Sequence, residues 1–180
     1  NVGIIDCVNA VEKKLKEIGI RTFVDNDDVH SLGYKINNWE LKGVPIRIEI
    51  GASEVENGKI KVVRRDDFSK EEISLNGLEN EIKNILEKIQ DNLFKKSQEL
   101  KIEKTKEVED YTSFKKTIEE GNFARIYFCE DEECEKKIKE ETQATARCLE
   151  FDQMTDDGKE GKCACCGKIS KHKWLFGKSY

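Results

Sequence analysis

The sequence predicts an α/β protein of two modules joined by a long helix, and three observations support this organisation. Residues 1–75 alternate helical and strand-like patterns, which is the order of elements in an α/β unit. Residues 76–109 repeat apolar side chains at helical spacing and contain no proline. Residues 110–180 hold six of the seven cysteines. We therefore expect a first domain at 1–75, a connecting helix at 76–109 and a small α+β domain at 110–180.

The composition excludes some classes of protein. Charged residues make up 38% and hydrophobic residues 37% of the chain, and no apolar run approaches the roughly 20 residues that span a bilayer. The first residues, NVGIIDCVNAVEKKL, lack the basic segment and long apolar core of a signal peptide. We therefore expect a cytoplasmic protein with no membrane partner. The net charge of −5 disfavours a general nucleic-acid binder, but 32 lysines and arginines leave room for a local basic face.

The first module should begin with an amphipathic helix that ends at Gly19, because glycine often follows the last turn of a helix. Its apolar residues recur at spacings of three and four: Ile4, Ile5, Val8, Val11, Leu15 and Ile18. A strand at 20–26 is expected next, with Ile20, Thr22 and Val24 on one face.

A short helix at 33–43 and a strand at 44–51 should follow. Asn57-Gly58 is typical of a tight hairpin turn, so residues 59–65 are expected to return as the antiparallel partner.

The connecting helix should present one apolar face, formed by Leu78, Ile82, Ile85, Leu86, Ile89 and Leu93. Beyond it we expect a strand at 123–128, a helix at 132–142 and a turn at 161–168.

Two cysteine pairs have the spacing of metal ligands. Cys129 and Cys134 form C-x4-C, and Cys163 and Cys166 form C-x2-C with Gly167 directly after it. A glycine there permits a tight turn whose backbone amides can point at the sulfurs. Four thiolates suit tetrahedral Zn²⁺ with no open position, so the site should be structural.

Other interpretations of the cysteines remain open. They could be ordinary reduced side chains buried as small hydrophobic groups, and Cys165 could replace Cys163 or Cys166 as a ligand. A redox C-x-x-C is disfavoured because no thioredoxin-like strand precedes it. We expect Cys7 and Cys148 to be packing residues.

The strand at 44–51 should carry a polar surface on one face. Alternation sets Arg47 and Glu49 opposite Ile46, Ile48 and Ile50. Arginine can read a guanine edge with two hydrogen bonds, and a carboxylate such as Glu40 can accept from base amino groups.

Arg64 and Arg65 could neutralise RNA phosphates near that face. On chemistry alone, an ordinary solvated strand with cross-strand ion pairs explains the same residues.

Several segments of the sequence resemble those of a known protein family. GIRTFVDNDD, GYKINNWELKGVPIRIEIG and ENGKIKVVRRD resemble the class II anticodon-binding domain of prolyl-tRNA synthetases, a mixed sheet flanked by helices. FCEDEECEKKIKEETQATARCLEF, GKCACCGK and FGKSY resemble the C-terminal zinc-binding domain of the same enzymes in their eukaryotic/archaeal-type form.

The resemblance implies roles for particular residues. Glu40 and Arg47 match residues that read the two guanines shared by proline anticodons, and Ser53 and Glu54 fall where further anticodon contacts are made. The four zinc ligands implied are Cys129, Cys134, Cys163 and Cys166. Tyr180 resembles a tail that folds back toward the catalytic domain.

Two departures from the family pattern matter. The chain reads GASE where relatives often read GPKD, so Ser53 replaces a lysine that would touch the anticodon. The apolar strand that usually begins the domain is missing from the sequence, so we expect a fragment of a longer protein.

The resemblance implies a function in tRNA(Pro) recognition as part of an enzyme that ligates proline to tRNA with ATP and Mg²⁺. These residues do not supply the class II catalytic core that would bind ATP and Mg²⁺, so the fragment alone should be inactive. The acidic runs DNDD and EDEE and the isolated His30 and His172 are interpreted as surface groups, so no residue is assigned a catalytic role. The whole enzyme is expected to be a homodimer. The alternative is a stand-alone, zinc-stabilised module that binds RNA or protein.

Overall fold

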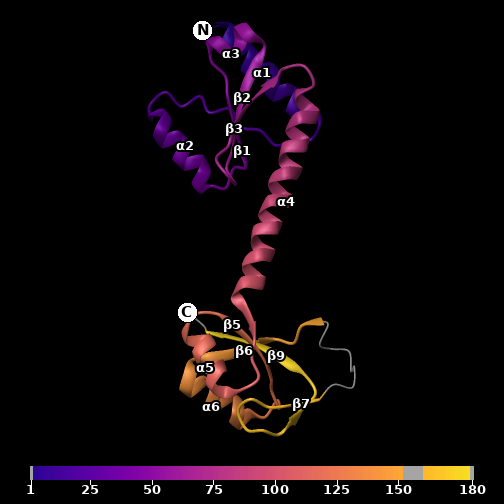
Figure 1. The fold of residues 1–180 in the computed structure, drawn as a ribbon. Coiled ribbons are helices and arrows are strands. Elements are labelled where there is room, and N and C mark those ends of the chain that lie inside the picture. The colour runs from indigo at the N-terminus through magenta and orange to yellow at the C-terminus, as the bar shows by residue number, and fades with distance from the viewer. Residues whose placement is uncertain (1, 152–159, 179–180) are drawn as a thin grey trace. The chain divides into compact units, whose positions relative to one another are not determined.

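The computed structural model describes residues 2–151 and 160–178, and the chain divides into two compact units, Asn1–Lys96 and Ser97–Tyr180 (Figure 1). The first unit contains α1 (Val2–Glu17), α2 (Leu32–Leu41), β1 (Ile46–Glu49), α3 (Ala52–Asn57), β2 (Lys59–Arg64) and β3 (Lys70–Ser74). The helix α4 (Leu78–Lys104) begins in the first unit and ends in the second.

The sheet of the first unit has the order β1-β2-β3, and both pairings are antiparallel. Val11 and Leu15 of α1 and Ile82 and Ile85 of α4 are buried in one core cluster with this sheet. The central strand β2 contributes Ile60 to that cluster, fully buried. The apolar stripes of two helices therefore close over one face of the sheet.

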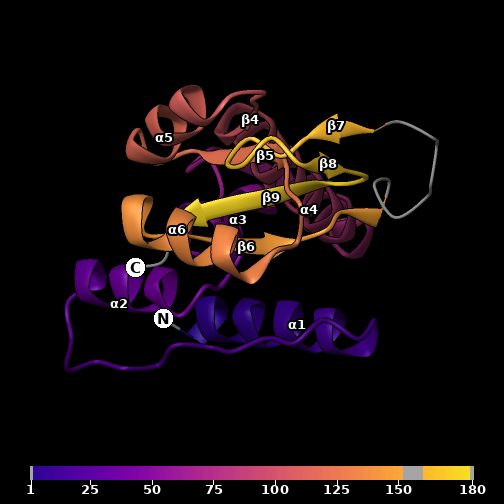
Figure 2. The same ribbon diagram turned by 90° about the horizontal axis from the view of Figure 1, so that it is seen from below.

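The second unit contains β4 (Thr105–Glu107), α5 (Tyr111–Glu119), β5 (Phe123–Tyr127), α6 (Glu132–Thr142), β6 (Ala144–Cys148), β7 (Gly161–Lys162), β8 (Ile169–Ser170) and β9 (Lys173–Lys178). Its main sheet has the order β4-β5-β9-β6, in which β4 and β5 are parallel and the other neighbours antiparallel. Figure 2 shows β9 between β5 and β6. Phe114 of α5 and Ile138 of α6 are buried in one cluster with Phe176 of β9.

The predicted α/β class is confirmed. The helices predicted at the start of the chain, at 33–43 and in the connecting segment are present as α1, α2 and α4. The strand 123–128 and the helix 132–142 are present as β5 and α6. The apolar face of α4 is buried as far as Ile89, whereas Leu93 is 40% exposed. Within the residues that the structure describes, no helix is long and apolar enough to cross a membrane.

Two predicted elements are wrong. Residues 20–26 form no strand, because no described strand pairs with them, although Ile20 packs against the core. Asn57-Gly58 does not make a two-residue hairpin turn. It ends the short helix α3, with Gly58 in the left-handed region at φ 63°. The antiparallel pairing of β1 with β2 is nevertheless as predicted.

Candidate RNA-recognition site and metal centre

A charged trio lies where the end of α2 faces the strand β1. Arg47 Nη1 donates to Glu40 Oε1 at 3.0 Å, and Arg47 Nε donates to Glu49 Oε1 at 2.9 Å. The alternation of β1 produces this arrangement, since Ile46 and Ile48 pack against the core. The structure thus brings together Glu40 and Arg47, the two residues predicted to read bases.

The trio remains open to a ligand. The side chains of Arg47, Glu40 and Glu49 are 23%, 29% and 35% exposed. Both carboxylates hold the guanidinium in place, which limits the side-chain entropy that a further hydrogen bond would cost. The arrangement can present a fixed donor fork beside a carboxylate acceptor, which are the two groups needed at a guanine edge.

A small hollow adjoins the trio. It has a volume of about 20 Å³, enough for one water-sized group. Its lining consists of Ile36, Trp39, Glu40, Val44, Arg47, Val63, Arg64 and Arg65. The hollow therefore has apolar residues and three arginines in its lining.

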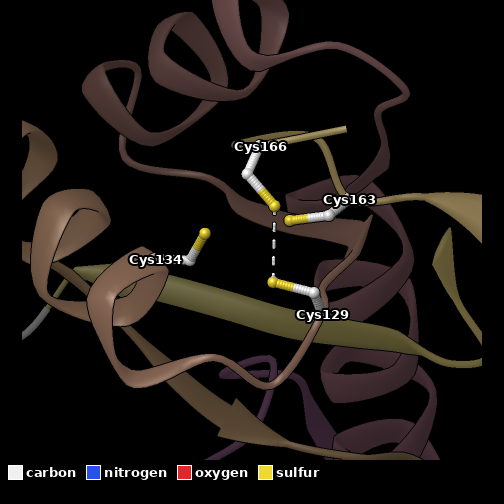
Figure 3. Close-up of side chains that lie close together, drawn as sticks. All are labelled: Cys129, Cys134, Cys163 and Cys166. Atoms are coloured by element: carbon white, nitrogen blue, oxygen red, sulfur yellow. Dashed lines mark hydrogen bonds between the residues drawn. The ribbon is translucent and has the colours of Figure 1, made fainter. Parts of the chain in front are cut away.

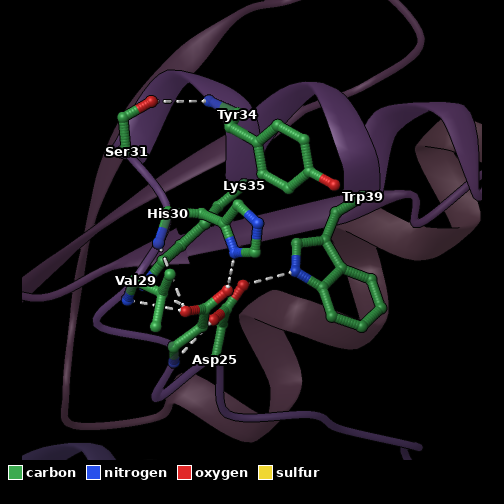
Figure 4. Close-up of polar contacts among 8 residues, drawn as sticks. Asp25, Val29, His30, Ser31, Tyr34, Lys35 and Trp39 are labelled. Atoms are coloured by element: carbon green, nitrogen blue, oxygen red, sulfur yellow. Dashed lines mark hydrogen bonds and ion pairs between the residues drawn. The ribbon is translucent and has the colours of Figure 1, made fainter.

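Trp39 in that lining is held by the loop before α2, shown in Figure 4. Its Nε1 donates to Asp25 Oδ2 at 2.7 Å, and this bond is the main reason that the pKa of Asp25 is lowered. Phe23 packs against the indole at a centroid distance of 4.7 Å, and Lys42 Nζ lies 4.4 Å from the indole ring. The loop thus fixes one wall of the hollow.

The rest of the loop is organised by Asp27, which accepts hydrogen bonds from the backbone N–H groups of Val29 and His30. The contact with the His30 ring lowers the pKa of the Asp27 carboxyl. His30 in turn stacks on Tyr34 at 4.3 Å. Interpreting DNDD as a solvated turn missed these roles. The signal was an aspartate within a polar turn, because such a side chain often accepts from the backbone N–H two residues further on, in an Asx turn.

The other two predicted anticodon residues lie in α3. Ser53 is exposed and accepts a hydrogen bond from Asn57 Nδ2 at 3.4 Å. Glu54 accepts from the Gly51 N–H at 3.0 Å and pairs with Lys61 Nζ at 2.8 Å, and Lys61 lowers its pKa. One Glu54 oxygen therefore caps the start of α3, and the other links α3 to β2. Contact of either residue with an anticodon stays a prediction.

The second unit contains a cluster of four thiols (Figure 3). The sulfurs of Cys129, Cys134, Cys163 and Cys166 all lie within 4.8 Å of one another, and Cys129 and Cys166 are 3.6 Å apart. Tetrahedral zinc with metal–sulfur distances of about 2.3 Å sets its sulfurs about 3.8 Å apart. The four cysteines are therefore close enough together that they could hold a metal ion.

A tight turn follows Cys163 and carries Cys166. Gly167 has φ 78°, and its N–H donates to the Cys163 carbonyl at 2.8 Å, which confirms the turn predicted after C-x2-C. Lys168 Nζ pairs with Asp131 Oδ2 at 2.7 Å and so joins the two cysteine segments. The backbone N–H of Lys168 lowers the pKa of Cys166 to about 7.

Burial has the opposite effect on the partners. It raises the pKa of Cys129 and that of Cys134, so both favour the neutral thiol while no cation is near. A divalent ion would compensate for the buried charge of four thiolates. Four sulfurs fit such an ion, and they would occupy all four positions around a tetrahedral metal.

The remaining cysteines lie outside this group. Cys165 is half-buried and packs against the core of the second unit, but the four clustered thiols do not include it. Cys7 packs against the first core, as expected. Cys148 is exposed, so its assignment as a packing residue was wrong, because β6 turns its last residues toward solvent. Tyr180 lies outside the described residues.

Comparison with known proteins agrees with this geometry. Residues 2–85 match the family model for the anticodon binding domain, and residues 111–180 match the model for the prolyl-tRNA synthetase C-terminal domain. A proline–tRNA ligase of Bacteroides fragilis is 40% identical over 174 residues, which is 96% of this chain and 35% of the relative. One of Acetoanaerobium sticklandii is 38% identical over 179 residues, 99% of this chain and 37% of the relative.

Solved structures show the same similarity. Prolyl-tRNA synthetase from Cryptosporidium parvum, in complex with L-proline and AMP, superposes with a TM-score of 0.89 at 32% identity. The match covers 100% of this chain and 38% of that one. The chain therefore spans between a third and two fifths of the length of these relatives.

The fold and the first family match define an anticodon-binding domain of an aminoacyl-tRNA synthetase, followed by a domain with a four-cysteine cluster. The second family match, over residues 111–180, narrows this class to the prolyl-tRNA synthetases. The chain belongs to the prolyl-tRNA synthetase family, of which it carries the anticodon-binding and C-terminal domains.

Proposed function

We propose that this chain recognises the anticodon of tRNA(Pro) within an enzyme that ligates proline to that tRNA. The observation that carries the proposal is the Arg47–Glu40 pair, which sets a guanidinium and a carboxylate together on a rigid strand–helix corner. The family matches on both sides of α4 support it.

The proposed mechanism is direct reading of unstacked bases. Arg47 exchanges one carboxylate partner for the acceptor edge of a guanine, and Glu40 accepts from a base amino group. Both partners are partly exposed, so the exchange does not leave a charge buried without a partner. Ser53 and Glu54 are proposed to lie at the edge of the same surface.

The rest of the proposed reaction belongs to the larger part of the relatives that this chain does not span. That part would bind proline, ATP and Mg²⁺ and would form the homodimer, in the cytoplasm. We accordingly expect the 180-residue chain to bind tRNA but to show no aminoacylation by itself.

We also propose that Zn²⁺ is the metal held by the four clustered cysteines. A closed set of four sulfurs is typical of structural zinc, which stabilises a fold without supplying an open coordination position. The ion would join the segment before α6 to the β7–β8 region, and no step of the reaction would pass through it.

The test is binding of the chain to a proline tRNA transcript and to the same transcript with its two anticodon guanines changed, at one fixed salt concentration. Wild-type protein should prefer the first transcript. Arg47→Ala should reduce that preference by about 1–3 kcal/mol, because a bidentate base contact is lost.

Lys13→Gln is the matched control, since it removes one positive charge from the same unit at a side chain that is 78% exposed. It should leave the preference unchanged. Equal binding of both transcripts by the wild type, or an Arg47→Ala protein that keeps the full preference, would contradict the assignment.

A further inference from the structure

Arg64 and Arg65 are adjacent in sequence but lie in different environments. Arg64 is paired with Ile46 in the sheet register and forms two hydrogen bonds with Asp66, at 3.0 and 2.7 Å. It also lies 3.7 Å from Asp67. Arg64 is therefore already neutralised by the protein itself.

Arg65 has no such partner. Its backbone N–H donates to the Pro45 carbonyl, which fixes the residue beside the start of β1. Its Nε is buried, yet among the described residues no acceptor lies within hydrogen-bond distance of it. No carboxylate in the described part of the chain forms an ion pair with its guanidinium. A buried donor without a partner costs free energy that a ligand can recover.

The pairing of β1 with β2 sets the position of Arg65. Arg47 is the register partner of Val63, and both line the hollow beside Trp39. Arg65 directly follows β2, where its backbone is held beside Pro45, and it also lines the hollow. The unpartnered guanidinium thus adjoins the proposed base-reading pair.

The chemistry of the hollow favours a phosphate oxygen over a base. Its volume of about 20 Å³ admits one water-sized group, such as a phosphate oxygen. Arg47 is matched by the carboxylates of Glu40 and Glu49, whereas Arg65 keeps an uncompensated charge. Arginine forms strong, charge-assisted hydrogen bonds with phosphate.

We propose that Arg65 binds a backbone phosphate of the RNA strand whose bases Arg47 and Glu40 read. Arg65 is then a positioning residue that fixes the register of the strand, and Arg64 holds the protein fold instead. The inference rests on the proposed function, because it takes the polyanion to be the anticodon strand of a tRNA.

The experiment measures binding of the chain to both transcripts over a range of salt concentrations, for wild type, Arg65→Gln, Arg65→Lys and the control Lys13→Gln. Arg65→Gln should weaken binding of both transcripts by a similar factor of about three to ten. It should also reduce the slope of log K against log salt by about 0.7, the value for one lost contact to a single strand. Arg65→Lys should keep the wild-type slope.

Two results would overturn the proposal. In the first, Arg65→Gln behaves like Lys13→Gln in affinity and slope. In the second, it weakens only the transcript with both guanines, which would make Arg65 a base reader. If wild type binds both transcripts equally, base reading by Arg47 fails, while the slope change at Arg65 still decides the phosphate contact.

A second measurement needs no tRNA. Titration with inorganic phosphate should shift the Nε–H resonance of Arg65 saturably in NMR spectra, and it should leave that of Arg64 in place because Asp66 occupies it. An Arg65 resonance that does not move, or that moves linearly together with Arg64, would contradict a phosphate site.

Discussion

Asp66 shows how a single carboxylate can organise the end of a strand. Its side chain is 1% exposed, and it accepts two hydrogen bonds from Arg64 and one from Asn92 of α4. Lys96 Nζ donates to its backbone carbonyl at 2.8 Å. The carboxylate therefore links β2 to the long helix, a role that the sequence RRDD did not reveal.

The Asp66 carboxylate should make stability depend on pH. Arg64 lowers the pKa of Asp66 from 3.8 to about 2, despite the opposing effect of burial. A lowered folded-state pKa gives stability that is present above pH 3.8 and is lost as the pH falls through about 2. Asp66→Asn should therefore lower the free energy of unfolding by about 2 kcal/mol at pH 7.

The measurement is urea unfolding followed on NMR signals of the first unit between pH 2 and 7. Asp28→Asn is the control, since it removes a carboxylate from an exposed residue of the same unit. The difference between Asp66→Asn and wild type should shrink toward pH 2. A difference that is constant over this range would contradict the linkage.

The four clustered cysteines give a second prediction about single residues. Cys166→Ser should reduce bound zinc below the wild-type content, because it removes one of the four clustered sulfurs. Cys165→Ser alters the adjacent residue and should leave the content unchanged. Metal analysis of the purified proteins checks both. The opposite pattern would make Cys165 the ligand.

Among the elements, α4 and α1 show which apolar residues form the first core. Ile85 of α4 is 2% exposed and Ile5 of α1 is 59% exposed. Val11 and Leu15 of the predicted stripe of α1 are buried in this core as expected, whereas Ile5 is exposed and Cys7, outside the stripe, packs against the core. Periodicity alone could not choose between the two neighbouring faces.

Ile85→Ala should lower the free energy of unfolding by about 2–5 kcal/mol, since it removes buried apolar atoms and leaves a cavity. Ile5→Ala makes the same chemical change at an exposed position and should cost less than about 0.5 kcal/mol. Denaturant unfolding of the first unit checks the pair. Equal losses for the two variants would contradict the assigned core face.

For the whole molecule, the metal should stabilise only one of the two units. The four clustered cysteines all belong to Ser97–Tyr180, whereas the core of Asn1–Lys96 is closed by its own helices. A strong chelator should therefore remove hydrogen-exchange protection from β5 and β9 and leave that of β2 in place. Equal loss in both units, or no loss in either, would contradict this division.

Several features were accessible from sequence because they are local. Helical spacing predicts α1, α4 and α6, and alternation predicts that Arg47 and Glu49 share a face of β1. The spacing of the cysteines predicts the four sulfurs that the fold brings together. The resemblance to prolyl-tRNA synthetases is carried by the same short segments.

Other features depend on contacts between distant residues. No strand was expected at 173–178, yet β9 (Lys173–Lys178) is an inner strand of the second sheet. An extended segment becomes a strand only when another backbone pairs with it, and this is why residues 20–26 failed as a strand. Neither outcome can be derived from side-chain alternation.

The sequence by itself determined the α/β class, the family resemblance, the four cysteines that cluster and the shared face of Arg47 and Glu49, because each is carried by residue types and their order along the chain. Only the tertiary structure decided that Arg64 is neutralised by Asp66 while Arg65 keeps a free guanidinium beside the hollow. Arg64 ends β2 and reaches Asp66, whereas Arg65 lies in the turn that follows, so the contacts made on folding, and not residue type, set the partner of each guanidinium.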